Sequence, residues 1–393
     1  MFLGLTGSSV AASSQSQHWR RHLYVSQRGS DKAHCTHARP CRSITHAVAV
    51  AHPGAQIDVG PGSYGETVRV TKRLTIRGFD FPTVNAAGYG RGILFRGARA
   101  AGSVVRGLLI KNATYEGILA LRTTRVTIAN NVVRHNDRGF FARYLTGECK
   151  TNGQPPGSGV ANGVADLRAG GCGEAIHLAS SSHSRVVRNR VTGNTGGIYL
   201  TDESGPAAYN LVARNRVFRN AWDCGITLAS HSRHAVTSNG RPRPQVGGVY
   251  DNTIRNNFAK RNGLRLAGAG VLVAAAFSGG AAYGNRIIGN TVSENGLPGV
   301  TLHSHQRHQD LNGNVIQYNV IGHNAVAGPG DGDAGIHHTA GIVVWSATTR
   351  ITRLDVSGNR ISWNHFGVWT QHAPRLRRAA NRCSHVRVPL RQR

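Results

Sequence analysis

The sequence contains few acidic side chains, few aromatic rings and no long apolar run. Only 18 of its 393 residues are Asp or Glu, against 47 Lys and Arg, which gives a net charge of +29. Aromatic residues make up 6% of the chain, and too few of them lie between the arginines to favour nucleic-acid binding by base stacking. No apolar run reaches the roughly 18 residues that a membrane-spanning helix needs. These absences argue against a membrane span and make nucleic acid a poor partner.

The basic excess is almost entirely arginine. Five of the basic residues are Lys and the rest are Arg. Arginine forks bind carboxylate, sulfate and phosphate in bidentate fashion, and a charge of this size favours anionic partners such as acidic polysaccharide, cell envelope or nucleic acid. The alternative explanation is a genome of high GC content, which encodes Arg in place of Lys at surface positions. Both explanations stay open at this point.

The six cysteines show no Cys-x-x-Cys spacing and no His spacing of a zinc site. Two pairs each close a local loop, which predicts two disulfides, Cys35–Cys41 and Cys149–Cys172, and an oxidising compartment. Cys224 and Cys383 have no obvious partner. The start of the chain is apolar, ends in small residues and resembles the tail of a secretory signal without its basic region, as a miscalled start codon would produce. We therefore expect a secreted or periplasmic protein.

A repeated hexamer, Asn-x-apolar-x-x-Asn, is the strongest pattern in the chain. Its seven copies are residues 131–136, 189–194, 215–220, 257–262, 290–295, 319–324 and 359–364. A Gly-apolar-x-apolar segment usually follows, and period-two apolar runs predict strands with one buried face. Asn and Gly tolerate the left-handed backbone of sharp corners. Stacked coils would place Asn above Asn at roughly 4.8 Å, so we predict a parallel β-helix.

These repeats resemble the right-handed parallel β-helix proteins of the pectate-lyase-like superfamily, in particular the secreted Asn-rich group that includes the nitrous-oxide-reductase maturation type. The resemblance implies an all-β, single-stranded solenoid over residues 22–372, with a leader at 1–21 and a basic tail at 373–393. A helix at 43–52, with Ser43 as N-cap, and strands at 56–59, 67–70 and 74–77 resemble the family's N-terminal cap. Insertions at 144–171, 232–247 and 325–340 are expected to flank a groove.

Aligning the strands by their Gly position places polar side chains in columns on the outer face. His177, Tyr199 and Thr227 share one column, Glu203, His231 and His305 share another, and His303 falls between the columns. Glu174, Asp202, Glu203 and Asp223 lie at the ends of three adjacent strands, which is a notable concentration in a chain so poor in acids. We therefore predict one solvent-open site with catalytic residues His177, Tyr199, Asp202, Glu203, Asp223 and His231, and substrate-binding residues Glu174, Thr227, His303 and His305.

The chemistry of this cluster favours an acidic polysaccharide as substrate. Lyase or C5-epimerase chemistry would use His177 or His231 as base and Tyr199 as acid. The substrate carboxylate would be neutralised by an Arg or by a cation, Ca²⁺ or another divalent ion, held by Asp202, Glu203 and Asp223. A glycoside hydrolase would instead use Asp202 or Glu203 with Asp223 as its two carboxylates.

Other readings remain open. Asp202 and Asp223 can simply cap turns, and 330–333 has a Gly-Asp-Gly-Asp spacing suited to calcium. The protein could also be a non-catalytic envelope, adhesion or maturation-factor β-helix. The sequence contains no Gly-His-Gly of polygalacturonases, no Arg-x-Pro-x-x-Arg of pectate lyases and no Asp-Pro-His of alginate epimerases. The oligomeric state is left undetermined.

Overall fold

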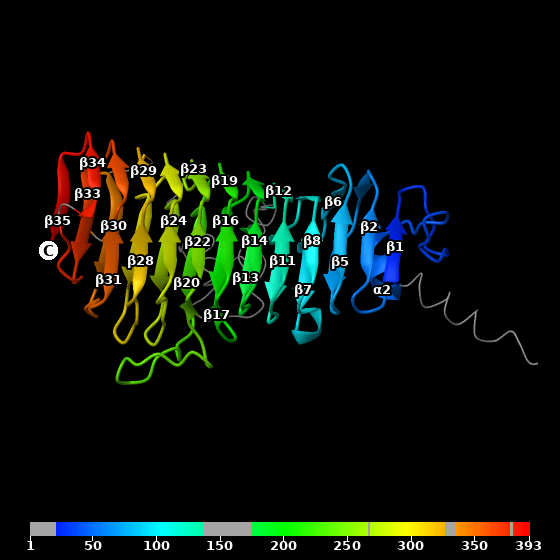
Figure 1. The fold of residues 1–393 in the computed structure, drawn as a ribbon, viewed down its shortest axis with the longest axis horizontal. Helices are drawn as coiled ribbons and strands as arrows, with labels where there is room; N and C mark the ends of the chain where they lie inside the picture. Colours follow the sequence, from blue (N-terminus) through cyan, green and yellow to red (C-terminus); the bar gives the residue numbers. More distant parts are fainter. Residues whose placement is uncertain (1–20, 137–173, 266–267, 327–334, 378–379) are drawn as a thin grey trace, which may run out of the picture.

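The computed structural model describes residues 21–136, 174–265, 268–326, 335–377 and 380–393. Within this part the chain winds into a right-handed parallel β-helix with three faces, each a parallel sheet of 11 strands (Figure 1). Most strands are only three to six residues long, because a residue in the left-handed conformation turns the chain at each corner. This residue is commonly the one before the corner Asn, as Arg214 is before Asn215, and not the Asn itself as we expected. The predicted fold class is confirmed.

The three sheets, named here A, B and C, each take about one strand from every coil. Sheet A contains β1 (His22–Val25), β2 (Gln56–Val59), β5 (Thr75–Gly78), β8 (Val104–Arg106), β11 (Thr127–Ala129), β14 (Arg185–Val187), β18 (Leu211–Ala213), β22 (Thr253–Arg255), β25 (Arg286–Ile288), β28 (Asn314–Gln317) and β31 (Leu354–Ser357). Sheet B contains β3 (Ser63–Tyr64), β6 (Thr83–Asn85), β9 (Leu109–Lys111), β12 (Val132–Arg134), β15 (Arg190–Thr192), β19 (Arg216–Phe218), β23 (Phe258–Lys260), β26 (Thr291–Ser293), β29 (Val320–Gly322), β32 (Arg360–Ser362) and β34 (Arg382–Ser384). Sheet C contains β4 (Val68–Val70), β7 (Arg91–Arg96), β10 (Glu116–Leu121), β13 (Glu174–Ala179), β16 (Gly196–Thr201), β20 (Ile226–Ser230), β24 (Val271–Ala275), β27 (Val300–Ser304), β30 (Ala340–Ser346), β33 (Phe366–Gln371) and β35 (Val388–Gln392).

A typical coil passes from sheet C to sheet A and then to sheet B, as in β16, β18 and β19. Each strand turns its apolar residues inward, so Ile198, Val212 and Val217 are at most 1% exposed and belong to one core that runs along the solenoid. A short pair, β17 (Ala207–Ala208) with β21 (Val249–Tyr250), sits at the corner between sheets C and A. The core is thus continuous along the solenoid axis, as stacked coils require.

Asparagine columns hold the corners. At the corner between sheets A and B, Asn215 donates through Nδ2 to Oδ1 of Asn257 at 3.0 Å and accepts from Asn189 at 3.0 Å. This column continues with the same bonds to Asn131 at one end and Asn381 at the other. A second column, at the corner between sheets B and C, links the last Asn of each hexamer. The predicted stacking is confirmed.

A third column, which we did not predict, stands at the corner between sheets C and A. It consists of Asn210, Asn252, Asn285 and Asn314, joined by Nδ2–Oδ1 bonds of 2.9–3.2 Å. Each member lies five residues before the first Asn of a hexamer, so the full repeat is Asn-x4-Asn-x4-Asn. All three corners in this part of the solenoid are therefore built in the same way.

A glycine usually follows the hexamer and faces inward at the start of a sheet C strand, although the strand after residues 131–136 has Ala175 at this position. A Cβ added to Gly197 would overlap the carbonyl oxygen of Gly225 in the next coil and crowd Val217 Cγ1. At Gly225 an added Cβ would approach Nδ2 of Asn262 at 2.8 Å. Only a residue without a side chain leaves room here for the Asn column and the adjacent coil.

The N-terminal cap forms as expected. Helix α2 (Ile44–Val50) begins after Ser43, whose side chain accepts a hydrogen bond from the amide of His46 at 3.1 Å. Its apolar side packs against the first coil, and Cys35 and Cys41 form the predicted disulfide beside it. The helix thereby covers the exposed end of the core. The predicted Cys149–Cys172 bond and the insertion at 144–171 lie outside the described residues.

The C-terminal boundary differs from our expectation. We predicted a basic tail from residue 373, but β34 and β35 add another turn to sheets B and C. Asn381 joins the column below Asn359 at 2.8 Å, and this bond extends the stacking although no hexamer is present. Among the described residues, no helix has the length and apolar character to cross a membrane.

Candidate functional site

The predicted polar columns lie on the outer face of sheet C, but they are not open to solvent. His177 pairs in register with Tyr199, and Tyr199 pairs with Thr227. All three alternate with core residues, as predicted, yet each is at most 5% exposed. Their burial corrects our expectation of a solvent-open patch. One reason is that the rings cover one another, since the centroids of His177 and Tyr199 are 5.0 Å apart.

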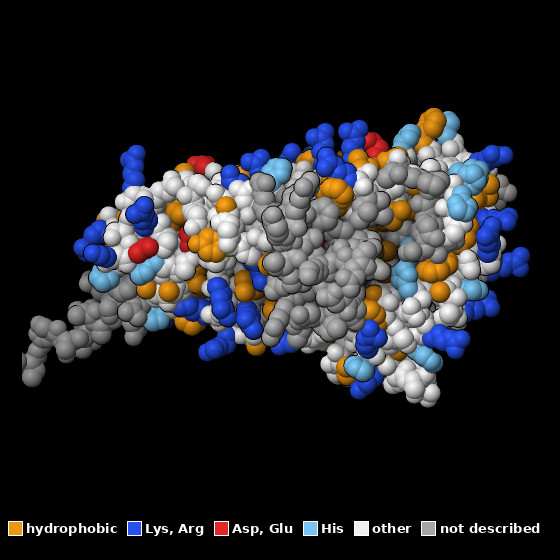
Figure 2. Space-filling model, turned by 180° about the vertical axis from the view of Figure 1, so that it is seen from behind, with side chains coloured by type: hydrophobic (Ala, Val, Ile, Leu, Met, Phe, Trp, Pro, Cys, Tyr) orange, Lys and Arg blue, Asp and Glu red, His pale blue; other side chains and the backbone are white. Residues whose placement is uncertain are grey.

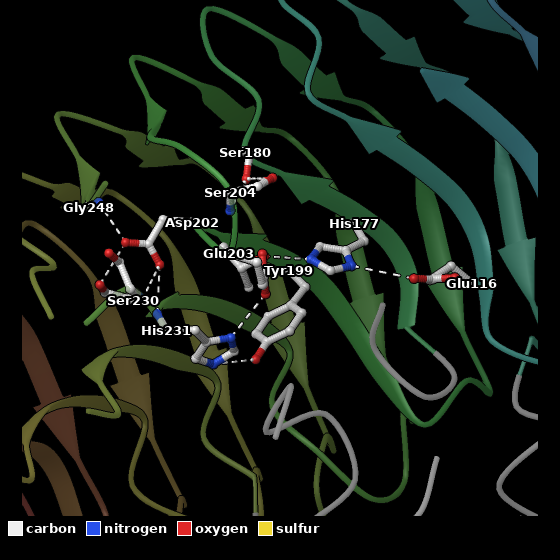
Figure 3. Close-up of polar contacts among 12 residues, drawn as sticks. Glu116, His177, Ser180, Tyr199, Asp202, Glu203, Ser204, Ser230, His231 and Gly248 are labelled. Atoms are coloured by element: carbon white, nitrogen blue, oxygen red, sulfur yellow. Dashed lines mark hydrogen bonds and ion pairs between the residues drawn. The ribbon is translucent and has the colours of Figure 1, made fainter. Parts of the chain in front are cut away.

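A chain of polar contacts crosses three coils of this face. His177 Nε2 lies 2.8 Å from the hydroxyl of Thr201, which in turn donates to Glu203. Glu203 Oε1 lies 3.0 Å from His231 Nδ1, and His231 Nε2 lies 3.3 Å from the hydroxyl of Tyr199 (Figure 3). Tyr199 therefore sits between two imidazoles, one of them anchored by a carboxylate. We call Glu116, His177, Tyr199, Thr201, Glu203 and His231 the relay cluster.

Glu116 is the member of the relay cluster nearest the N-terminus, and it connects His177 to Arg91. Glu116 Oε1 is 3.5 Å from His177 Nδ1, and its other oxygen is 2.8 Å from Nε of Arg91. The Glu116 side chain is fully buried, whereas that of Arg91 is 23% exposed. The cluster thus connects a buried carboxylate to a guanidinium that reaches solvent.

The pKa shifts in the relay cluster favour a different charge on each of Glu203, His231 and Tyr199. Burial alone would raise the pKa of Glu203, but the hydrogen bond and charge of His231 outweigh burial and lower this pKa to about 2. Burial alone would lower the pKa of His231, but the bond to Glu203 raises it. Burial and the neighbouring carboxylates raise the pKa of Tyr199 well above its usual value. The favoured state is an ion pair, Glu203 with His231, beside a protonated phenol.

Two further acids flank a position that has no side chain. In the stack Glu174 pairs with Gly196, and a Cβ added to Gly196 would lie 3.5 Å from Glu174 Cγ and 3.6 Å from Asp223 Oδ2. Burial, followed by the charges of Glu116 and Asp223, raises the pKa of Glu174 well above its usual value. Burial likewise raises the pKa of Asp223 to about 6.

Within the described part of the chain, Glu174 lacks the partners that buried carboxyl groups normally have. It is 1% exposed, and no other described residue forms a hydrogen bond with either of its carboxylate oxygens. The hydroxyl of Thr195, the residue before Gly196, is also buried without a partner in the described part of the chain. A buried polar group without a partner costs free energy, so the carboxyl group of Glu174 and the hydroxyl of Thr195 do not contribute to stability through hydrogen bonds to described residues.

Asp202 points away from the relay cluster. Its carboxylate accepts from the amides of His231 at 2.6 Å, Ser232 at 3.1 Å and Gly248 at 2.5 Å, and from the Ser230 hydroxyl at 2.8 Å (Figure 3). These donors lie at the two ends of the insertion at 232–247. The geometry therefore favours the structural alternative for Asp202, in which it fastens this insertion to the corner.

His303 and His305 form a separate group at the end of β27, which lies beyond β20 and β24 along sheet C. Their ring centroids lie 5.4 Å apart, and both rings meet Trp345, at 5.7 and 5.4 Å. Thr227 stays in the column next to Tyr199. The ten predicted residues are thus divided: Glu174, His177, Tyr199, Glu203, Asp223, Thr227 and His231 lie together, Asp202 faces the insertion, and the two histidines lie apart.

The predicted cation site does not assemble from Asp202, Glu203 and Asp223. Within the described ranges, only Cys35, Cys41 and His46 bring three potential ligand atoms within 4.8 Å of one another, and the two cysteines are bonded to each other. Asp202 is excluded because its carboxylate is fully used by amide and hydroxyl donors. The Gly-Asp-Gly-Asp segment at 330–333 lies outside the described residues.

Glu116 and Thr201 are functional candidates that we did not predict. Glu116 precedes Gly117-Ile-Leu-Ala, which matches Glu174 before Ala175-Ile-His-Leu, so extending the strand alignment by one coil would have found it. Thr201 follows Tyr199 by two residues and therefore faces the same side. Neither residue belongs to a hexamer, which is why the repeat search passed over both.

Comparison with known proteins agrees with the fold. A family model described as "Periplasmic copper-binding protein (NosD)" matches residues 63–226 and 164–341. No curated protein matches the chain. The Dettilon tailspike protein (gp208) is similar in structure, with a TM-score of 0.53 and 15% identity, over 95% of this chain and 69% of that one. The DFA-IIIase of Arthrobacter chlorophenolicus A6 gives 0.50 and 12%, over 89% and 77%. At these identities the structural likeness concerns the fold alone.

Proposed function

The chain belongs to the NosD family, a periplasmic group, and we propose that it works outside the cytoplasm as a β-helix that binds an acidic polysaccharide and transfers protons on its sugar rings, as a lyase or C5-epimerase does. The observation that carries the proposal is the position of Tyr199, between His177 and a His231 that is anchored by Glu203. The net charge of +29 supports an anionic substrate. On one face of the solenoid, Lys and Arg side chains are spread along its length with few acids among them (Figure 2).

β-Elimination from a uronate unit needs three functions. A base removes the C5 proton, the C–H electrons form the C4–C5 double bond, and the C4–oxygen bond breaks as the leaving oxygen takes a proton. His177 is the base in this scheme, and Tyr199 donates its phenolic proton to the leaving oxygen. His231 then returns a proton to Tyr199 through the 3.3 Å contact. Epimerisation keeps the first step but returns a proton to C5 on the opposite face.

The substrate carboxylate must be neutralised before C5 becomes acidic. A protonated carboxyl group can do this by donating a hydrogen bond to it. Glu174 suits this role, because its pKa is raised well above the usual range and its oxygens are bonded by no other described residue. Glu203 is unsuitable, since it is ionised and held by His231.

A screen of acidic and neutral glycans tests this function. The products are followed for new unsaturated ends, new reducing ends and hydrogen exchange at C5. We expect unsaturated ends or C5 exchange on a uronate polymer, and a loss of about 10²–10⁴-fold in turnover for Tyr199→Phe, the range of a general acid–base group. Thr301→Val, in the same column two coils beyond Thr227, is the matched control and should retain most activity. Full turnover by Tyr199→Phe would remove the relay cluster from the chemistry.

A glycoside hydrolase is the second candidate, because Glu174 and Asp223 flank Gly196. Hydrolysis needs one protonated and one ionised carboxyl group across the scissile bond. A pKa of about 6 leaves Asp223 largely ionised at neutral pH, while burial raises the pKa of Glu174 well above its usual value and favours its protonated form. New reducing ends without unsaturated ends would favour this candidate. Failure to turn over any glycan would favour the non-catalytic envelope or maturation role.

The family description mentions copper, and the described residues do not fit a resident copper ion. Copper sites use His, Cys and Met ligands. The chain has one Met, at position 1, outside the described part. The single three-residue ligand set in the described ranges loses its two thiols to the Cys35–Cys41 disulfide, which leaves only the imidazole of His46. We therefore assign no step to copper.

A further inference from the structure

A groove on the outer surface of sheet A lies outside the relay cluster. Its volume is about 580 Å³, and its walls include Tyr209, Asp251, Arg255 and Arg286 above a floor of Leu211 and Ile288. Tyr209 and Asp251 precede members of the third Asn column, so the groove begins at the corner between sheets C and A. Glu203 and His231 follow the sheet C strands that lead into the same corner.

Two arginines from adjacent coils face this groove. Arg286 pairs in register with Thr253, and Arg255 pairs with Ile288, two residues further along the strands. The two side chains therefore start on a diagonal, on the order of 8 Å apart from strand spacing and rise. Both are exposed. Two guanidinium forks at this separation can hold a carboxylate from two sides.

Tyr209 provides an aromatic wall. Its ring is 51% exposed and rests edge-on against Tyr250, with centroids 5.6 Å apart. Tyr250 stacks on Tyr283 at 4.9 Å and donates a hydrogen bond to the Pro244 carbonyl at 2.9 Å. These contacts fix the ring while leaving part of it uncovered. An exposed, fixed aromatic ring can pack against the apolar face of a sugar.

Asp251 narrows the choice of ligand. It is exposed beside two arginines, so the groove offers a hydrogen-bond acceptor as well as cationic donors. A phosphodiester group has no hydrogen-bond donor for this acceptor. A sugar ring that carries one carboxylate also carries hydroxyl donors, and it can satisfy the arginines, Asp251 and Tyr209 together.

From these observations we infer a second carbohydrate subsite, in which Arg255 and Arg286 bind the carboxylate of a uronate unit, Asp251 accepts from its hydroxyls and Tyr209 packs on its ring. The inference takes its class of ligand from the proposed function, but it requires no chemistry at the relay cluster. This subsite would hold a polymer across the corner while another unit lies at sheet C.

The test measures binding of oligogalacturonate and oligomannuronate to the full chain by calorimetry, with carboxyl-reduced oligosaccharides as neutral counterparts. Arg106 provides a matched control, since it is exposed and occupies the same sheet A column as Arg255, four coils away through Ala129, Val187 and Ala213. We expect Arg255→Ala with Arg286→Ala to weaken uronate binding about tenfold or more, and Tyr209→Ala to weaken it severalfold, while Arg106→Ala has little effect.

The outcomes separate the subsite from the proposed chemistry. Tyr199→Phe should lose turnover and keep this affinity, whereas the double arginine variant should raise KM on polymer and keep kcat. Binding without turnover by the wild type would leave the subsite standing and count against the proposed function. Equal affinity for acidic and reduced oligosaccharides, equal losses in the Arg106 control, or no binding by the wild type would overturn the subsite.

Discussion

The corners of the solenoid and the outer face of sheet C both bury many polar side chains, but their hydrogen bonding differs. At the corners, Asn215 accepts two bonds and donates two, so its amide is satisfied. On sheet C, no other described residue bonds the carboxylate oxygens of Glu174, and burial raises the pKa values of Glu174 and Asp223. A fold that satisfies its corners so thoroughly could equally have placed apolar residues on sheet C. The difference indicates that the corner residues serve stability, and it makes the sheet C acids the candidates for a functional role.

The largest expected effect is at the corner. Asn215→Ala removes four hydrogen bonds and leaves donors of Asn189 buried without an acceptor. We expect the free energy of unfolding to fall by about 3 kcal/mol, given the cost of orphaned buried groups. Denaturant unfolding measures it, and Asn239→Ala, at an exposed Asn in the insertion, should change little. A loss under 0.5 kcal/mol for Asn215→Ala would contradict the structural role of the column.

Replacement of Asp223 should have a smaller effect that depends on pH. The folded-state pKa of Asp223 is about 6, above its ordinary value of 3.8. The group therefore favours folding fully at low pH, and this contribution is lost as the pH rises from about 4 to 6. Asp223→Asn should accordingly stabilise the protein at pH 8, by about 1–3 kcal/mol, and leave it nearly unchanged at pH 4.

Thermal unfolding of both proteins at pH 4, 6 and 8 checks this expectation. Asp251→Asn serves as the control, because Asp251 is exposed and its pKa is raised less. Equal destabilisation of Asp223→Asn at every pH would mean that Asp223 is a structural cap of its turn.

The smallest expected change in stability is at Glu174. A protonated carboxyl group and an amide are similar in size and both uncharged. Because the pKa of Glu174 is raised, Glu174→Gln should shift the free energy of unfolding by less than about 1 kcal/mol at pH 4. Turnover should nevertheless fall, because Gln cannot become charged and places its donors differently. A large loss of stability with full turnover would contradict this expectation, because Glu174 would then serve stability as the corner asparagines do.

The solenoid could be predicted from the sequence because its determinants repeat. Each hexamer places Asn at two fixed positions and is usually followed by Gly. The structure shows why: Gly197 leaves space for the next coil, and Asn215 bonds to the coils on both sides. The third column escaped us because its members precede the hexamers. The tail was misjudged for a similar reason, since Asn381 continues a column without a complete motif.

The site could be predicted only in part. Strand alternation placed His177 and Tyr199 on one face correctly, but burial depends on what packs over that face, which no local pattern reports. We predicted that Asp202 is catalytic because it lies with Glu203 at the end of a strand, near other acids. Its donors come from residues 230–232 and from Gly248, on the far side of an insertion. Contacts across such an insertion produce no repeating pattern in the sequence, so the sequence alone does not predict them.

The Asn columns also have a direction. Along the whole column between sheets A and B, each Nδ2 points to the Oδ1 of the following coil, from Asn131 to Asn381. The first Oδ1 is satisfied by the amide of Leu108 at 3.1 Å, so the column starts on backbone and then offers N–H donors toward the C-terminus. During synthesis, each finished coil would therefore present donors to the asparagine that leaves the ribosome next.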